Sequence, residues 1–395
     1  MIAALDMLFD KVTVDLPFSI PNELDKPNSQ FYERSTAPPA DLAHVLKVPR
    51  LTKTSPHYRP LIRVRLTSAH TEPLLISTQD HPEATPKVKM SKFALPPSAS
   101  SDDLAENAHA ALERHTGGIF GHFSLKYPIL SNPAPALIVH VHGGGFVAMT
   151  SYSHLPYVRK WSIDTDMPVF SVDYRLAPEY AFPTQLEECY QAYRWVVANA
   201  LRVGSTGQRI ILAGDSAGGN LVAAVTLMAI AEGFRVPDGL LLSYPVLNLT
   251  DSLSCSRILS STDPMLNTGM LMHLKKLLRP TASDFDPNSE PFMSPVFAPD
   301  EALRRFPPTR IVVGEFDPLL DDSVMFYNVK IILLSKIIIN WNLIKQRLKA
   351  IDHDVEISIR PGLGHGFLQL VNLAPEVHEE VGLTSLYLRD LCGLG

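Results

Sequence analysis

Alternating apolar and mixed stretches divide the second part of the chain into strands and helices. Segments with apolar residues at helical spacing, such as the one after Pro183 and the alanine-rich run Asn220 to Ala231, alternate with short apolar runs. Such runs predict buried strands. They are Ala136 to His142, Pro168 to Tyr174, Ile210 to Ala213, Gly239 to Tyr244, Arg310 to Val313 and Val355 to Arg360. Strands that alternate with helices predict an α/β fold with a parallel sheet.

Residues 1–127 have a different pattern, in which Pro, Ser and charged residues recur without a regular apolar period. This composition predicts a loop-rich region, with a linker over 82–102 and a short helix over 103–114. The whole chain has a net charge of −6, from 35 Lys and Arg against 41 Asp and Glu, and no basic block. We therefore do not expect nucleic acid as a partner.

Three widely spaced cysteines favour reduced thiols in the cytosol over a disulfide framework, and no Cys and His spacing indicates a metal site. The first residues lack the basic start, apolar core and cleavage site of a secretory signal. No run of about twenty apolar residues occurs, so we expect no transmembrane segment. These features predict a cytoplasmic globular protein.

The apolar run Ile210 to Ala213 leads into a Gly-x-Ser-x-Gly sequence centred on Ser216, and a helix-forming segment follows. This sequence between a strand and a helix is typical of a sharp turn that exposes a nucleophilic serine. The short motif alone is weak, so its flanks carry the prediction. We predict Ser216 as a nucleophile; the alternative is a glycine-rich turn without chemistry.

A glycine triplet follows the strand that ends near His142. Consecutive glycines allow backbone N–H groups to point at one position, as a tetrahedral oxyanion requires. We predict an oxyanion hole formed by the N–H groups of Gly143, Gly144, Gly145 and Ala217. A plain turn is the alternative, and we expect His142 itself to be structural.

A serine nucleophile needs a base and a group that orients the base. His365 lies in a glycine-flanked loop directly after a strand, and Asp317 lies beyond the end of the strand Arg310 to Val313. Catalytic groups gather at the carboxyl ends of strands in α/β sheets, and the order Ser, Asp, His is that of α/β-hydrolases. We predict His365 as the base and Asp317 as the acid, with Asp321 or Asp322 as alternative acids.

Several segments together resemble the hormone-sensitive lipase family of α/β-hydrolases. They are His142 to Gly145, Asp173 to Glu179, Gly214 to Gly219, Asp317 to Asp321 and His365 to Phe367. Other stretches are similar to the animal members of the family: Phe146 to Ser151, Arg235 to Gly239, Pro291 to Pro295 and Asp321 to Phe326. The resemblance is good from about Pro133 to Leu370 and weaker upstream.

The resemblance implies an α/β-hydrolase fold, with a mostly parallel sheet flanked by helices and an N-terminal cap region. It implies a catalytic triad of Ser216, Asp317 and His365. It implies oxyanion donors at Gly143, Gly144 and Ala217. It further implies hydrolysis of lipid esters such as acylglycerols and cholesteryl esters, in the cytosol at or near lipid droplets, without a metal or organic cofactor. The oligomeric state stays open.

On this basis we divide the chain at residue 128. Residues 1–127 correspond to the remnant of an N-terminal domain plus a cap region, and 128–395 to the catalytic domain, with 249–289 as a cap insertion. Animal members carry a large N-terminal domain, so we interpret the chain as N-terminally shortened. Only Arg279 to Glu290 stands where vertebrate members have a long phosphorylated insert, and no Arg-Arg-x-Ser site occurs.

The segment Val329 to Gln346 is dense in Ile, Leu, Lys and Asn and lies between the predicted acid and base. Its removal joins Asn328 to Arg347 and restores a helix that resembles the family's. We interpret the segment as intron sequence retained in frame. The alternative is an apolar helix that contacts lipid while its lysines reach the interface.

Two other functions stay open. One is a carboxylesterase for small esters, which shares the chemistry but gains no rate on emulsified substrate. The other is a catalytically silent receptor of the hydrolase fold that binds a small apolar ligand. Such a receptor usually lacks a triad member, and this chain keeps all three, so that interpretation requires a triad distorted by the extra segment.

Overall fold

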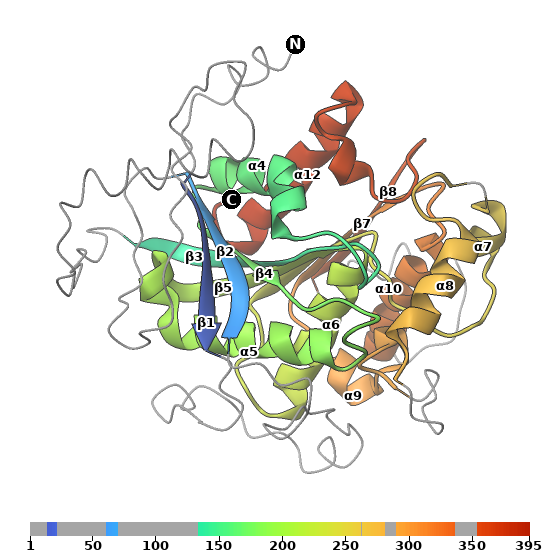
Figure 1. The fold of residues 1–395 in the computed structure, drawn as a ribbon, viewed down its shortest axis with the longest axis horizontal. Helices are drawn as coiled ribbons and strands as arrows, with labels where there is room; N and C mark the ends of the chain where they lie inside the picture. Colours follow the sequence, from blue (N-terminus) through green and yellow to red (C-terminus); the bar gives the residue numbers. More distant parts are fainter. Residues whose placement is uncertain (1–13, 22–60, 70–132, 262, 281–289, 336–353) are drawn as a thin grey trace.

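The computed structural model describes residues 14–21, 61–69, 133–261, 263–280, 290–335 and 354–395. They form one eight-stranded sheet with helices on both faces (Figure 1). The strands are β1 (Val14–Pro21), β2 (Leu61–Ser68), β3 (Ala134–Val141), β4 (Val169–Asp173), β5 (Ser205–Asp215), β6 (Gly239–Ser243), β7 (Thr309–Gly314) and β8 (Val355–Arg360).

The helices carry the labels of Figure 1. They are α4 (Leu155–Thr165), α5 (Thr184–Asn199), α6 (Ala217–Ala231), α7 (Cys255–Leu259), α8 (Thr268–Leu278), α9 (Asp300–Leu303), α10 (Leu320–Ser335) and α12 (Pro375–Leu391). Short 3-10 helices are η4 (Ser151–His154), η5 (Ala200–Val203), η6 (Pro295–Phe297) and η8 (Phe367–Leu370).

The strand order is β1-β2-β4-β3-β5-β6-β7-β8. From β4 to β8 every neighbouring pair is parallel. β2 pairs antiparallel with both β1 and β4. Each apolar run that predicts a strand after residue 133 forms one, and the mostly parallel sheet confirms the α/β-hydrolase fold.

The two antiparallel strands lie in the part of the chain predicted to be loop-rich. In β2, Ile62, Val64 and Leu66 are buried, whereas the arginines between them are more exposed. This alternation of apolar and polar residues is a strand pattern, hidden in the sequence by the proline-rich and charged residues around it. The predicted linker over 82–102 and helix over 103–114 lie outside the described residues.

The core has two halves because successive strand residues point to opposite faces. In β3, Leu137 and Val139 join the cluster packed under α5 and α6. Ala136 and Ile138 face the cluster of α4 and α12. Figure 1 shows these two helix pairs on opposite sides of the sheet. A sheet covered on both faces explains why its parallel strands appear in the sequence as continuous apolar runs.

The structure describes most of the predicted cap insertion and the first residues of the extra segment. Helices α7 and α8 lie within the predicted cap insertion 249–289, called the cap below, of which 262 and 281–289 lie outside the described residues. Helix α10 continues without a break from Asn328 to Ser335, so its last turns belong to the segment Val329 to Gln346. Residues 336–353 lie outside the described residues. The division at residue 128 and the retained-intron hypothesis stay predictions.

Candidate active site

The parallel strands bring the predicted catalytic residues to one edge of the sheet. Ser216 directly follows β5, Asp317 follows β7, and His365 follows β8. Because these strands run in the same direction, their carboxyl ends meet at one edge. The topology thereby joins side chains up to 149 positions apart in the sequence.

Ser216 occupies a strained turn between β5 and α6. Its φ of 53° and ψ of −118° lie outside the regions open to most residues with a side chain, which costs about 1–3 kcal/mol. The turn forms because α6 begins very close to β3. A Cβ added to Gly218 would lie 2.0 Å from the carbonyl oxygen of Val141, so only glycine fits there. This is the strand-turn-helix geometry that presents a serine hydroxyl at the top of a hydrolase sheet.

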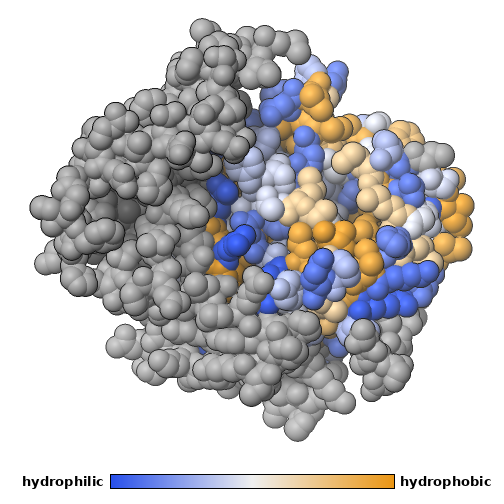
Figure 2. Space-filling model, viewed as in Figure 1, coloured by the Kyte–Doolittle hydropathy of each residue, from blue (hydrophilic) through white to orange (hydrophobic). Residues whose placement is uncertain are grey.

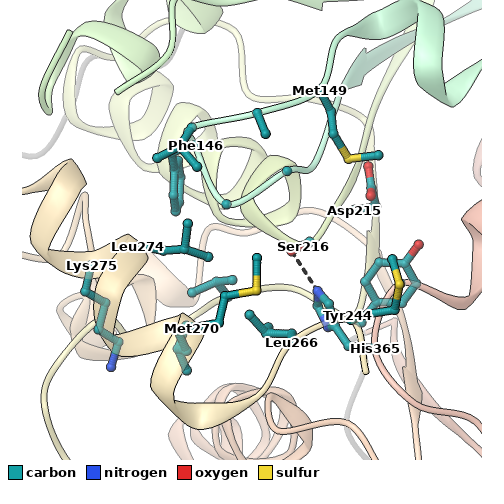
Figure 3. Close-up of a pocket in the computed structure, with 18 of the residues that line it drawn as sticks. Phe146, Met149, Asp215, Ser216, Tyr244, Leu266, Met270, Leu274, Lys275 and His365 are labelled. Carbon is teal, nitrogen blue, oxygen red and sulfur yellow. Dashed lines mark hydrogen bonds between the residues drawn. The ribbon is translucent and has the colours of Figure 1, made fainter. Parts of the chain in front are cut away.

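His365 bridges the other two predicted residues. Its Nε2 lies 2.9 Å from Ser216 Oγ, the contact drawn as a dashed line in Figure 3, and its Nδ1 lies 2.8 Å from Asp317 Oδ2. Both distances are those of hydrogen bonds, and all three side chains are buried. The ring of Tyr244 packs edge-on against the imidazole, with 5.0 Å between centroids. The arrangement can transfer a proton from the hydroxyl to the imidazole.

Asp317 favours the protonated form of His365, the predicted base. Burial by itself lowers the pKa of His365, but the Asp317 carboxylate outweighs burial, with smaller help from more distant carboxylates, and raises the pKa above 6.5. The other oxygen of Asp317 accepts the N–H of Leu319 at 2.8 Å, which fixes the rotation of the carboxylate. Asp317 is therefore placed both to orient the imidazole and to stabilise its cation.

The two alternative acids are engaged elsewhere. Asp321 accepts the backbone N–H of Ser256 at 2.8 Å, and Asp322 pairs with the Arg257 guanidinium at 3.0 Å. Burial raises the pKa of Asp322 to about 6, against the opposing effect of Arg257. Both carboxylates attach the start of α10 to the cap, and Asp317 is the one at the imidazole.

The loop over residues 143–146, called the glycine loop below, offers a different set of oxyanion donors from the predicted one. The N–H of Gly143 donates to Asp215 Oδ1 at 2.9 Å, so it is not free to bind an oxyanion. Gly144 and Gly145 line the pocket beside Ser216, and their N–H groups have no acceptor among the described residues. The same holds for the N–H of Ala217. The expectation for Gly143 is thus corrected, whereas the other three N–H groups remain available.

A buried polar cluster beneath the glycine loop holds Gly143 in place. Asp215 accepts the Tyr157 hydroxyl at 2.9 Å and lies 3.4 Å from His154 Nε2. Burial alone raises the pKa of Asp215, but His154 and His140 outweigh burial and hold the pKa well below its usual value. Sequence reasoning missed this role, although Asp215 stands directly before Ser216, the predicted nucleophile, in the motif.

His142 has the structural environment expected for it. It is buried, its ring stacks on Tyr174 with 4.2 Å between centroids, and its Nδ1 lies 2.7 Å from the carbonyl oxygen of Gly143. Burial lowers its pKa to about 3, with a contribution from His154. A neutral, stacked imidazole of this kind supports the loop.

A pocket of about 200 Å³ opens beside Ser216 and His365. Its walls are mostly apolar, with Phe146 from the glycine loop and Leu266, Met270 and Leu274 from the cap around the space in Figure 3. The aliphatic stem of Lys275 also lines it, while its Nζ donates to the carbonyl oxygen of Thr250. An apolar cavity next to the predicted nucleophile suits the hydrocarbon part of a substrate.

No helix in the described part of the chain has both the length and the apolar character needed to cross a membrane.

Comparisons with known proteins agree with this fold. Residues 138–329 match the family described as the alpha/beta hydrolase fold. The match ends at Val329, where the extra segment begins. The chain is 57% identical over 136 residues to hormone-sensitive lipase of Mus musculus, which covers 34% of this chain and 18% of the mouse protein. The chain thus spans about a fifth of that relative's length.

Two esterases match over more of their length. Carboxylesterase NlhH of Mycobacterium tuberculosis is 30% identical over 257 residues, covering 65% of this chain and 73% of that protein. Among solved structures, carboxyl esterase 2 of Tuber melanosporum superposes with a TM-score of 0.56 at 28% identity, covering 66% of this chain and 80% of the fungal chain.

Proposed function

This chain belongs to the hormone-sensitive lipase family of α/β-hydrolases, and on that premise we propose that it hydrolyses carboxylic esters. The observation that carries the proposal is the placement of the His365 imidazole between the Ser216 hydroxyl and the Asp317 carboxylate, at hydrogen-bond distance from both. A silent receptor of the same fold has no need for this arrangement.

The proposed reaction has two halves. His365 removes the proton of Ser216 as its Oγ attacks the ester carbonyl, and then donates that proton to the leaving alcohol. Water then attacks the acyl-enzyme while His365 takes a proton from it. The bond between the acyl carbon and Ser216 Oγ breaks, His365 returns the proton to Oγ, and the carboxylic acid leaves. Asp317 keeps the imidazole oriented through its hydrogen bond to Nδ1 and stabilises the cation.

Backbone N–H groups stabilise the negative charge that develops on the carbonyl oxygen. We assign its donors to the N–H groups of Gly144, Gly145 and Ala217, because these three are without acceptors among the described residues. The N–H of Gly143 instead fixes the loop to Asp215. Each such donor contributes about a hundredfold to a thousandfold in rate.

We further propose that the substrates are esters of lipids, such as acylglycerols and cholesteryl esters. The apolar pocket supports this, and so does exposed apolar surface on the cap. Leu253, Ile258 and Leu259 are exposed on or next to α7, with Leu259 81% exposed. Figure 2 shows hydrophobic residues on the side where Figure 1 draws α7. Such a surface suits peripheral contact with a lipid aggregate, as at a lipid droplet.

Hydrolysis by purified protein tests the proposal. Ser216→Ala is expected to abolish turnover of p-nitrophenyl butyrate while the melting temperature is kept. Ser385→Ala is the matched control, since this buried serine lies in α12 and its hydroxyl has no hydrogen-bond partner among the residues that the structure describes. Turnover preserved in Ser216→Ala would exclude this nucleophile.

A second assay separates lipase from small-ester carboxylesterase. The initial rate on diacylglycerol is followed through the concentration at which the substrate forms an emulsion. A rate that rises at that point supports lipid substrates. A rate that saturates below it, with no gain on emulsion, favours the small-ester enzyme suggested by the bacterial carboxylesterase relative.

A further inference from the structure

A carboxylate of the cap contacts the backbone of the proposed base. Asp263 lies between α7 and α8 and is 8% exposed. Its Oδ2 accepts the backbone N–H of His365 at 2.9 Å. Its Oδ1 accepts the N–H groups of Met265 and Leu266, both at 2.8 Å. Oδ2 therefore holds the loop that contains His365, and Oδ1 holds the turn of the cap that contains Met265 and Leu266.

The turn that Asp263 organises is part of the substrate pocket. Met265 and Leu266 line this pocket together with Ser216 and His365, and Figure 3 shows Leu266 beside the imidazole. The two sides are also in close contact, because a Cβ added to Gly364 would lie 2.5 Å from Asp263 Oδ2. The pocket wall and the base are thus attached to the same side chain.

We propose that Asp263 is a positioning residue, whose carboxylate couples the pocket wall at Met265 and Leu266 to the placement of the His365 imidazole. The inference rests on the proposed ester hydrolysis at Ser216. It predicts that a substrate which packs against this wall steadies the base in reach of the serine hydroxyl.

Electrostatics add to the coupling. The imidazole of His365 faces Asp317 from the loop after β7, Asp263 from the cap and Asp215 from the end of β5, with the Tyr244 ring against it from the end of β6. Burial lowers the pKa of His365, and these carboxylates raise it, Asp317 most. Removal of the Asp263 charge therefore lowers the pKa of the base.

Asparagine cannot replace this carboxylate. An amide has one acceptor oxygen and an NH₂ group that only donates, whereas the backbone N–H groups approach both oxygens of Asp263. In Asp263→Asn, the NH₂ group faces an N–H donor on one side or the other. The substitution thus removes the charge and one side of the connection while the shape is kept.

The test is the pH dependence of kcat/KM on p-nitrophenyl butyrate for wild type and Asp263→Asn. We expect the acid-limb pKa to fall by about half a unit to one unit, kcat to fall about tenfold or more and KM to rise as the wall loosens. Asp251→Asn is the matched control, because this cap carboxylate is 58% exposed and paired with Arg279. It removes the same charge from the cap and is expected to leave the acid limb in place.

A titration of the His365 ring by NMR separates the proposed coupling through Asp263 from the proposed ester hydrolysis, because the titration needs no turnover. Absence of Ser216-dependent hydrolysis in the wild type refutes the proposed function, and a lowered His365 pKa in Asp263→Asn still supports the coupling. An unchanged pKa by NMR, with an unchanged acid limb, overturns the coupling and leaves the hydrolase intact. If Asp263→Asn does not fold, Gly364→Ala displaces the same contact from the opposite side, and a lowered pKa is again the expected result.

Discussion

The sharpest prediction concerns Gly144 in the proposed oxyanion loop. Its φ is +108°, a region that residues with a side chain rarely adopt, and an added Cβ would lie 2.2 Å from the carbonyl oxygen of Ala148. That atom belongs to the backbone of the same loop, so Gly144→Ala forces the loop itself to shift. Gly144 lines the pocket, and its N–H has no acceptor among the described residues. The shift of the loop is expected to displace this N–H from the position proposed for the oxyanion.

The expected magnitude follows from the loss of one donor. Loss of an oxyanion donor raises the activation free energy by about 2.7–4 kcal/mol, which lowers kcat by about a hundredfold to a thousandfold. KM should change little, because the oxyanion exists only in the transition state and the tetrahedral intermediate. Backbone strain at such a φ costs about 1–3 kcal/mol of stability, so the melting temperature is expected to fall as well.

The assay compares kcat and KM on p-nitrophenyl butyrate at a temperature where the variant is folded by circular dichroism. Gly393→Ala is the control, since Gly393 also has a left-handed φ, +75°, but no atom closer than 3.4 Å to an added Cβ. The fall in melting temperature of Gly393→Ala measures the cost of a side chain at a left-handed φ without a steric clash. A Gly144→Ala variant whose kcat stays within about fivefold of wild type would refute the assignment of this N–H as a donor.

Three further predictions concern pH, the cap and the extra segment. The base acts only when neutral, so kcat/KM should fall as the pH drops through the pKa of His365 in the folded protein. Because Asp317 raises this pKa, the midpoint of the acid limb in a pH–rate profile is expected to lie above the ordinary histidine value of 6.5. Arg257→Ala leaves the buried Asp322 carboxylate without its partner, so urea unfolding should show a loss of about 3–5 kcal/mol, whereas a double change to Arg257→Met and Asp322→Leu should recover most of it. If Val329 to Gln346 is retained intron, cDNA across this region should lack the segment, and a protein without these residues should be at least as active as the full chain. Transcripts that all contain the segment would refute the hypothesis.

Local sequence was sufficient where a feature depends on neighbouring residues. The strands after residue 133 and the turn at Ser216 follow from apolar runs and glycine spacing within a few positions. His365 and Asp317 could be selected because each stands just after a strand, and parallel strands share one carboxyl edge. β2 escaped prediction although it alternates, because proline-rich and charged residues around it favoured loops.

Contacts between distant segments were decided by the tertiary structure. Three aspartates near the start of α10 were chemically equivalent in the sequence, and packing alone directed Asp317 to the imidazole and Asp322 to Arg257. The N–H of Gly143 is occupied by a carboxylate 72 positions away, and the backbone of His365 by Asp263, 102 positions away. A hydrogen bond depends on two groups meeting within about 3 Å. Which groups meet is settled by how the sheet, the cap and the loops pack, and no local pattern encodes that choice.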